Sequence, residues 1–166
     1  MTEIWKSIEG YETYSVSTFG NVRNDTTGKV LKPTTQQNRQ RITLCLNGYV
    51  ETFLTYRLVA FAFIPNPKCK KVIDHIDNNS LNNNVENLRW TTQSENICNS
   101  TLSRVNTSGV KGVYWDKSKQ KWKSQICINK KVSHIGSYNT IEEATIARQT
   151  KANEIFGAYT NDCEKL

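Results

Sequence analysis

The residues best suited to chemistry lie in one stretch, residues 72–96, which reads VIDHIDNNSLNNNVENLRWTTQSEN. His75 is one of only two histidines. Imidazole is mostly neutral at pH 7, so it is the usual side chain for taking a proton from water. Asp74 and Asn96 offer oxygen donors, and two of these suffice for Mg²⁺, whose other positions go to water and substrate phosphate oxygens. The stretch therefore predicts one hard metal ion beside a general base.

The elements that must position these side chains follow from the same stretch. The pattern predicts a strand, an Asn-rich loop, a second strand and a helix, at residues 72–76, 77–87, 88–91 and from Thr92. Thr92 followed by Glu95 is a capping-box signature, which places the helix start. Neighbouring residues on a regular strand face opposite sides. We therefore expect Asp74 and His75 to share a site only if the strand bends or ends there.

A structural interpretation of the same residues stays open on spacing alone. Asp74 can cap a turn, and His75 can be a hydrogen-bonded structural histidine. The asparagines are also typical of loops, because their side chains bond the nearby backbone. Glu86 and Asp77 are interpreted as a solvated loop acid and a turn former.

The flanking segments predict small modules. Residues 4–23 alternate briefly and are broken by glycines, which is typical of a hairpin or meander. Residues 41–46 and 49–54 predict a hairpin, because Asn47-Gly48 suits a type I′ turn. Residues 55–64 group their apolar side chains as a buried helix does, and that helix must stop before Pro65.

The C-terminal segment predicts a sheet and a helix. Its candidate strands are residues 113–115, 122–128 and 131–137. A second capping box, Thr140 with Glu143, begins a helix that ends at Gly157. The stripe expected to face the sheet consists of Ala144, Ala147, Ala152, Ile155 and Phe156.

Charge and cysteine content narrow the function classes. The chain of 166 residues has a net charge of +7 and a pI of about 9.2. Residues 104–131 hold eight Lys and Arg against Asp116 alone, which favours a polyanionic partner, although an anionic membrane surface would also fit. The cysteines, Cys45, Cys69, Cys98, Cys127 and Cys163, form no C-x-x-C pair and are expected to be reduced and mostly buried. The sequence predicts an intracellular, non-secreted protein without membrane insertion.

Residues 56–96 closely resemble the HNH endonucleases of phages and mobile introns. The resemblance implies that Asp74 and Asn96 are metal ligands, that His75 is the general base, and that Asn87 holds the loop and orients His75. The third motif position carries Asn96 instead of the more widespread His, which keeps Mg²⁺ or Mn²⁺ usable and lowers affinity for softer metals. No small-molecule cofactor is implied.

The same resemblance implies a reaction. His75 would deprotonate a water that attacks phosphorus in line, leaving 5′-phosphate and 3′-hydroxyl ends. The expected substrate is double-stranded DNA, and an expected monomer with one site would nick one strand. Residues 3–24 resemble a small nuclease-associated (NUMOD-like) module, whose Trp5, Tyr11 and Tyr14 are expected in the core. Its basic residues are expected near phosphates; they are Arg23, Lys29, Lys32, Arg39 and Arg41.

Residues 108–157 resemble the APETALA-type DNA-binding domain, through G-V-x-W, K-W and I-G-S-Y-x-T-x-E-E-A. The resemblance implies a three-stranded sheet that enters the major groove. Lysines stand where arginines often read guanine, so phosphate contact should outweigh base recognition. The candidate contacts are Lys111, Tyr114, Lys117, Lys121, Lys123, Gln125 and Lys130. A solvated basic face is the alternative.

Together these patterns predict an α+β chain of small modules: residues 1–54, a central ββα-metal (HNH) unit at 55–102, a linker at 103–109, and an APETALA-like domain at 110–166 with a three-stranded antiparallel sheet packed on one helix. The predicted function is that of a site-directed, homing-type DNA endonuclease with one metal ion, in the host-cell cytoplasm if a phage encodes it. The alternatives are a non-catalytic DNA-binding regulator that retains the HNH frame and an RNA-directed binder.

Overall fold

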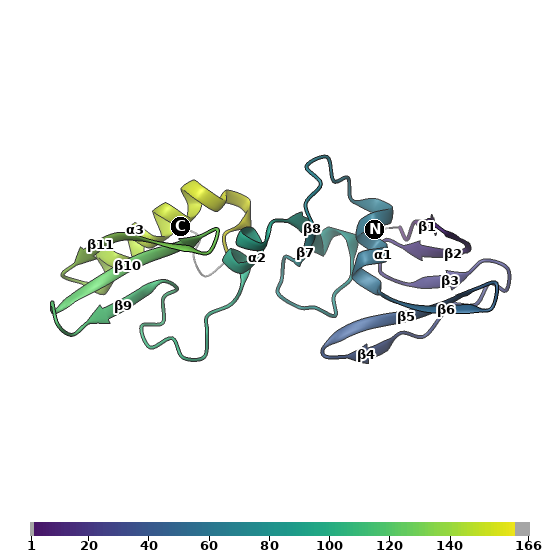
Figure 1. The fold of residues 1–166 in the computed structure, drawn as a ribbon, viewed down its shortest axis with the longest axis horizontal. Coiled ribbons are helices and arrows are strands. Elements are labelled where there is room, and N and C mark those ends of the chain that lie inside the picture. The colour runs from purple at the N-terminus through teal and green to yellow at the C-terminus, as the bar shows by residue number, and fades with distance from the viewer. Residues whose placement is uncertain (1, 162–166) are drawn as a thin grey trace. The chain divides into compact units, whose positions relative to one another are not determined.

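A computed structural model describes residues 2–161 and shows small antiparallel sheets with short helices (Figure 1). The α+β class is therefore confirmed. The described residues fall into two compact units, the first ending at Thr91 and the second beginning at Thr92. The predicted module boundaries at residues 54, 102 and 109 stay predictions. None of the helices in the described range is long and apolar enough to cross a membrane.

Two three-stranded sheets form the N-terminal part of the first unit. The first is the predicted meander, in the order β1 (Trp5–Ile8), β2 (Tyr11–Ser17), β3 (Val22–Asn24). The second contains β4 (Thr34–Gln36), β5 (Arg39–Leu46) and β6 (Tyr49–Leu54). Asn47 and Gly48 both have positive φ, 52° and 83°, so the predicted β5–β6 hairpin turn is confirmed.

Helix α1 (Thr55–Phe63) joins these sheets to the strands that carry the candidate site. It follows β6 directly and ends before Pro65, as predicted. Its buried residues Leu58 and Val59 share one apolar core with Val16 and Leu44 of the sheets and with Trp90. The N-terminal strands and the strands that carry the candidate site are therefore supported by the same core.

The candidate site of the first unit is carried by a two-stranded antiparallel pair, β7 (Val72–His75) and β8 (Leu88–Thr91). The loop between them ends in the short 3₁₀ helix η1 (Val85–Asn87). After Thr92 the chain enters α2 (Gln93–Asn99), and the capping box of Thr92 with Glu95 is present as predicted.

The second unit is built on β9 (Val113–Asp116), β10 (Lys121–Ile128) and β11 (Lys131–Tyr138), in the order β11-β10-β9. Helix α3 (Ile141–Phe156) covers one face of this sheet (Figure 1) and is followed by the 3₁₀ helix η2 (Gly157–Tyr159). The predicted capping box of Thr140 with Glu143 is present. Cys98 of α2 packs with Ile126, Ala152 and Phe156, which fixes α2 to this unit.

One expectation about burial is partly confirmed and another is wrong. Ala144, Ala152 and Phe156 are buried as predicted. The buried row of α3 runs through Ala144, Arg148, Ala152 and Phe156, four residues apart, whereas Ile155 is 36% exposed. The prediction differs from the structure because it did not place Arg148 on the buried face of the helix. The cysteines are also less buried than expected: Cys98 is buried, but Cys45, Cys69 and Cys127 are exposed. Cys45 alternates with the buried Leu44 on β5, and Cys163 lies outside the described residues.

Candidate active site

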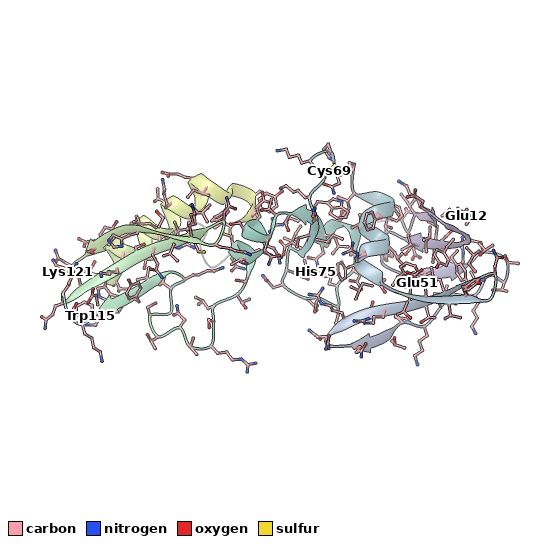
Figure 2. All side chains as sticks on the ribbon, in the orientation of Figure 1. Glu12, Glu51, Cys69, His75, Trp115 and Lys121 are labelled. Carbon is pink, nitrogen blue, oxygen red and sulfur yellow. The ribbon has the colours of Figure 1, made fainter. Side chains whose placement is uncertain are left out.

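The candidate site lies at the end of β7. Asp74 and His75 are its last two residues, and their side chains are buried. The strand ends at His75, with Asp74 and His75 still in regular register with Arg89 and Leu88, and their shared site stays a prediction. Immediately afterwards, the backbone N–H of Ile76 donates to the carbonyl of Asn87, which begins the Asn-rich loop. Figure 2 labels His75 among the side chains around β7 and α1.

Asp74 is paired across the strands with Arg89. The two residues are register partners in β7 and β8. Both Nε and Nη2 of Arg89 lie close to Oδ2 of Asp74, at 2.9 and 2.8 Å. The carboxylate is therefore held in position by a guanidinium that is itself largely buried.

His75 sits between α1 and the loop. The ring of Tyr56 meets it edge-on, with 5.2 Å between ring centroids, and the Tyr56 hydroxyl accepts a hydrogen bond from Arg39. Nε2 of His75 lies 3.2 Å from Oδ1 of Asn83. Burial lowers the pKa of His75, and the positive charge of Arg39 lowers it further, while the contact with Asn83 opposes the shift. The imidazole is therefore neutral at pH 7 and able to accept a proton.

Asn87 closes the loop through its carboxamide. Its Nδ2 donates to Oδ1 of Asp77 and to the carbonyl of Asn82, both at 2.8 Å. Its Oδ1 accepts the backbone N–H of Asp77 at 3.0 Å. Asn87 thus holds the loop, as the resemblance implies, and its expected effect on His75 stays a prediction.

Asp77 is a turn former. Its carboxylate accepts from the backbone of Asn79 and the side chain of Asn82 as well as from Asn87. Burial raises the pKa of Asp77, but these hydrogen bonds outweigh burial and the pKa is lowered. Glu86 is exposed, as interpreted from the sequence.

Asn83 is a site residue that the sequence did not single out. It is 4% exposed and contacts the ring of His75. It lies within three consecutive asparagines, residues 82–84, whose types are identical. Residue type therefore does not distinguish Asn83 from its two neighbours, and only its tertiary contact with His75 does.

Asn96 lies on α2, half-buried, in the second unit. Its role as a metal ligand stays a prediction. Within the described residues no three His, Cys, Asp or Glu side chains gather in a metal-binding group. A carboxylate with a carboxamide, completed by water and phosphate, fits a hard cation such as Mg²⁺ better than a thiophilic one.

The candidate DNA contacts of the second unit lie mostly on one face of its sheet. Ser124 and Ile126 of β10 are buried on the side of α3, so Lys123 and Gln125 alternate with them and face away. Tyr114 is the register partner of Lys123 on the same outer face. Figure 2 labels Lys121 near the end of this sheet. The remaining candidates, Lys117 and Lys130, are exposed.

Three of these lysines already have protein partners. Lys121 donates from Nζ to Oδ1 of Asn139. Lys123 forms an ion pair with Asp116. Lys111 donates from Nζ to the carbonyls of Ile97, Cys98 and Ser100, at 3.0, 2.6 and 2.8 Å. Lys111 therefore caps the C-terminal end of α2, where a cation is favoured by the helix dipole. Its predicted contact with DNA stays a prediction.

Two family matches cover most of the first unit and extend into α2. A NUMOD4 motif matches residues 3–47, and an HNH endonuclease family model matches residues 57–97. The chain is 42% identical over 111 residues to the HNH endonuclease L247 of Acanthamoeba polyphaga mimivirus, covering 58% of this chain and 25% of that protein. It is 36% identical to the HNH endonuclease L245 of the same virus, covering 72% of this chain and 35% of that protein. The chain thus spans about a quarter to a third of these relatives.

A phage protein and a solved structure agree with these matches. Protein 3.8 of Escherichia phage T7 is 33% identical over 87 residues, covering 52% of this chain and 71% of that protein. The structure of the HNH homing endonuclease I-HmuI is 41% identical, with a TM-score of 0.53, and covers 57% of this chain and 55% of that one.

The HNH match includes every residue that the resemblance assigned to the site: Asp74, His75, Asn87 and Asn96. The N-terminal match begins at residue 3 and runs through the first meander into β5. The APETALA-type resemblance of residues 108–157 stays a prediction. With a NUMOD4 motif ahead of this HNH segment, the chain belongs to the HNH endonuclease family.

Proposed function

We propose that the chain is a DNA endonuclease that hydrolyses a phosphodiester bond with one divalent ion, Mg²⁺ or Mn²⁺. The observation that carries this proposal is the pair at the end of β7: a buried imidazole with a lowered pKa, next in sequence to a buried carboxylate that is paired with Arg89. An ordinary structural histidine does not require that neighbour. Together they provide a base for water and an anchor for a cation.

In this proposal, His75 takes a proton from the attacking water. Tyr56 restricts the rotation of its ring, and burial keeps it neutral until the proton arrives. Asp74 and Asn96 would hold the metal ion, which supplies charge neutralisation for the phosphate and the departing 3′ oxygen. Arg39 adds positive charge near the base, which favours a phosphate there.

The second unit would position duplex DNA. Its outer sheet face carries Tyr114, Lys121 and Gln125, and exposed lysines extend the positive charge into its turns. Such a surface contacts phosphates strongly and reads bases weakly. We propose an APETALA-like mode in which this sheet enters the major groove. A single site in a monomer then cuts one strand, as a homing-type nicking enzyme would.

The experiment is conversion of supercoiled plasmid to the open-circle form. The target sequence is unknown, so a plasmid library carrying random inserts serves as substrate, and strand ends are mapped by sequencing. We expect open circles with Mg²⁺ or Mn²⁺, none with EDTA, and strong loss of product in Asp74→Asn. Cleavage that persists in EDTA would contradict metal use, and linear product at the first turnover would contradict nicking.

A non-catalytic DNA-binding regulator is the second candidate. The pairing of Asp74 with Arg89 favours it, because a carboxylate already neutralised by a guanidinium also makes sense as structure alone. This candidate predicts tight, salt-sensitive binding to duplex DNA with no metal-dependent product anywhere in the library. Matched RNA duplexes as competitors separate it from an RNA-directed binder.

A further inference from the structure

Asn83 links the candidate base to the N-terminal sheets. On one side its Oδ1 lies 3.2 Å from Nε2 of His75, and on the other its Nδ2 donates to Oε1 of Gln40 at 2.8 Å. Gln40 belongs to β5, 43 residues earlier in the chain. The buried carboxamide is therefore held from both ends.

The loop that carries Asn83 is seated on the first sheet and its turn. The N–H of Val85 donates to the carbonyl of Thr18 at 2.8 Å. Gly20, with φ of +83°, packs so closely that a Cβ there would lie 2.8 Å from Cβ of Asn83. Any larger residue at position 20 would push Asn83 away. These contacts fix the position of the Asn83 side chain against the N-terminal part of the unit.

The orientation of the carboxamide determines which nitrogen of His75 carries the proton. Because Nδ2 of Asn83 donates to Gln40, its oxygen faces His75. A carbonyl oxygen only accepts, so Nε2 of His75 must be the donor. In neutral imidazole the other nitrogen, Nδ1, then holds the lone pair.

We propose that Asn83, fixed by Gln40, is a positioning residue that keeps the proton of His75 on Nε2 and makes Nδ1 the nitrogen that receives the proton of water. This inference rests on the proposed function, in which His75 is the base. It gives the N-terminal sheets a part in the reaction, since one of their residues determines the hydrogen bonding of the catalytic imidazole.

The tautomer can be measured without cleavage. The full chain, labelled with ¹⁵N in histidine, is examined by long-range ¹H–¹⁵N NMR at about pH 8, where neutral imidazole dominates. The signals lost in His75→Asn belong to His75. We expect Nε2–H in the intact chain, a mixture in Asn83→Leu and in Gln40→Met, and a return to Nε2–H in Asn83→Asp, whose carboxylate still accepts. A proton on Nδ1 in the intact chain, or a tautomer unchanged in Gln40→Met, would overturn the proposal.

Gln40→Met keeps this test decisive if the buried Asn83→Leu change prevents folding, because Gln40 is only half-buried. In single-turnover nicking, we expect Asn83→Leu to lower kcat roughly 10- to 100-fold with KM for DNA unchanged, as for other residues that orient a functional histidine. Asn83→Asp should recover most of the rate. Asn78→Gly is the matched control, because Asn78 is exposed and already has φ of 60°.

The outcomes separate the two proposals. If the intact chain never cuts DNA, the proposed function fails, and the NMR result still decides the tautomer. If His75→Ala abolishes cutting while Asn83→Leu changes neither kcat nor the tautomer, the proposed function stands and the positioning role fails.

Discussion

Two nitrogens of Arg89 converge on one carboxylate oxygen of Asp74: Nε and Nη2 approach Oδ2 at 2.9 and 2.8 Å across the β7–β8 pair. The side chains of Asp74 and Arg89 are 5% and 17% exposed. The negative charge at the predicted metal site is therefore compensated before any cation arrives. A metal ion bound there would share Asp74 with the arginine.

Arg89→Gln should destabilise the metal-free protein by roughly 3 kcal/mol, because it removes the guanidinium that is paired with a buried carboxylate. Mg²⁺ should then raise the Tm of the variant more than that of the intact chain, since the cation replaces the lost positive charge. Thermal unfolding with and without Mg²⁺ measures both effects. Arg104→Gln, which removes an exposed arginine, is the control. Equal metal-induced shifts in intact chain and variant would show that Asp74 does not bind the ion.

Asn87→Ala should loosen the loop between β7 and β8. It removes three hydrogen bonds by which the buried carboxamide of Asn87 holds Asp77 and Asn82. We expect a loss of about 1–3 kcal/mol in urea unfolding. Glu86→Ala, at the neighbouring exposed position, should leave stability and cleavage unchanged. An effect of Glu86→Ala on metal-dependent cleavage would instead make Glu86 a ligand.

The cleavage rate should be nearly independent of pH above about 7 and fall in acid. Burial and Arg39 lower the pKa of His75, so the base stays neutral to a lower pH than an exposed histidine, whose pKa is about 6.5. Arg39→Gln removes a positive charge that lowers this pKa, so the acid limb of the rate profile should move to higher pH. Single-turnover rates between about pH 5 and 9 test this prediction. An acid limb that moves the opposite way would exclude His75 as the titrating base.

The lowered pKa of His75 also makes the stability of the folded chain depend on pH. The unfolded chain takes up a proton on His75 near pH 6.5, and the folded chain resists it. The contribution of neutral His75 to the free energy of unfolding is therefore fully present above about pH 6.5. It is lost as the pH falls through the lower pKa of His75 in the folded chain. In His75→Asn this part of the acid destabilisation should disappear.

Removing exposed lysines should reduce the salt dependence of DNA binding. If Lys117 and Lys130 each contact one phosphate, each change to Gln lowers the slope of log K against log salt by about 0.9. Lys111→Gln should behave differently. Because Lys111 caps α2, its loss should cost roughly 1.5–3 kcal/mol of stability in the second unit. A reduced salt slope in Lys111→Gln with unchanged stability would contradict the capping role.

Local signals predicted much of the fold. Pro65 ended α1, Asn47-Gly48 gave the β5–β6 turn, and two capping boxes placed the starts of α2 and α3. Strand β4 was missed because Thr34–Gln36 is exposed on every residue and shows no alternation. The predicted buried face of α3 did not include Arg148, since hydrophobic periodicity assigns no arginine to a buried position.

Site residues could be predicted from the sequence where their type alone suggests a function. They could not be predicted where their role depends on contacts with residues distant in the sequence. Asp74 and His75 stood out by type and by their place at the end of a strand. Asn83 did not, because its neighbours are identical and its partner, Gln40, is distant in sequence. The contacts of Lys111 with the end of α2 could not be predicted either, because its partners are backbone carbonyls, which a sequence does not display.

The most direct test compares two histidine variants in Mg²⁺-dependent conversion of supercoiled plasmid to open circles. The account predicts that His75→Ala loses roughly 10²- to 10⁴-fold in rate, while His134→Ala, which changes an exposed histidine of the second unit, cuts like the intact chain. If His75→Ala binds DNA and still nicks at the intact rate, His75 is not the base, and the account of this site is wrong.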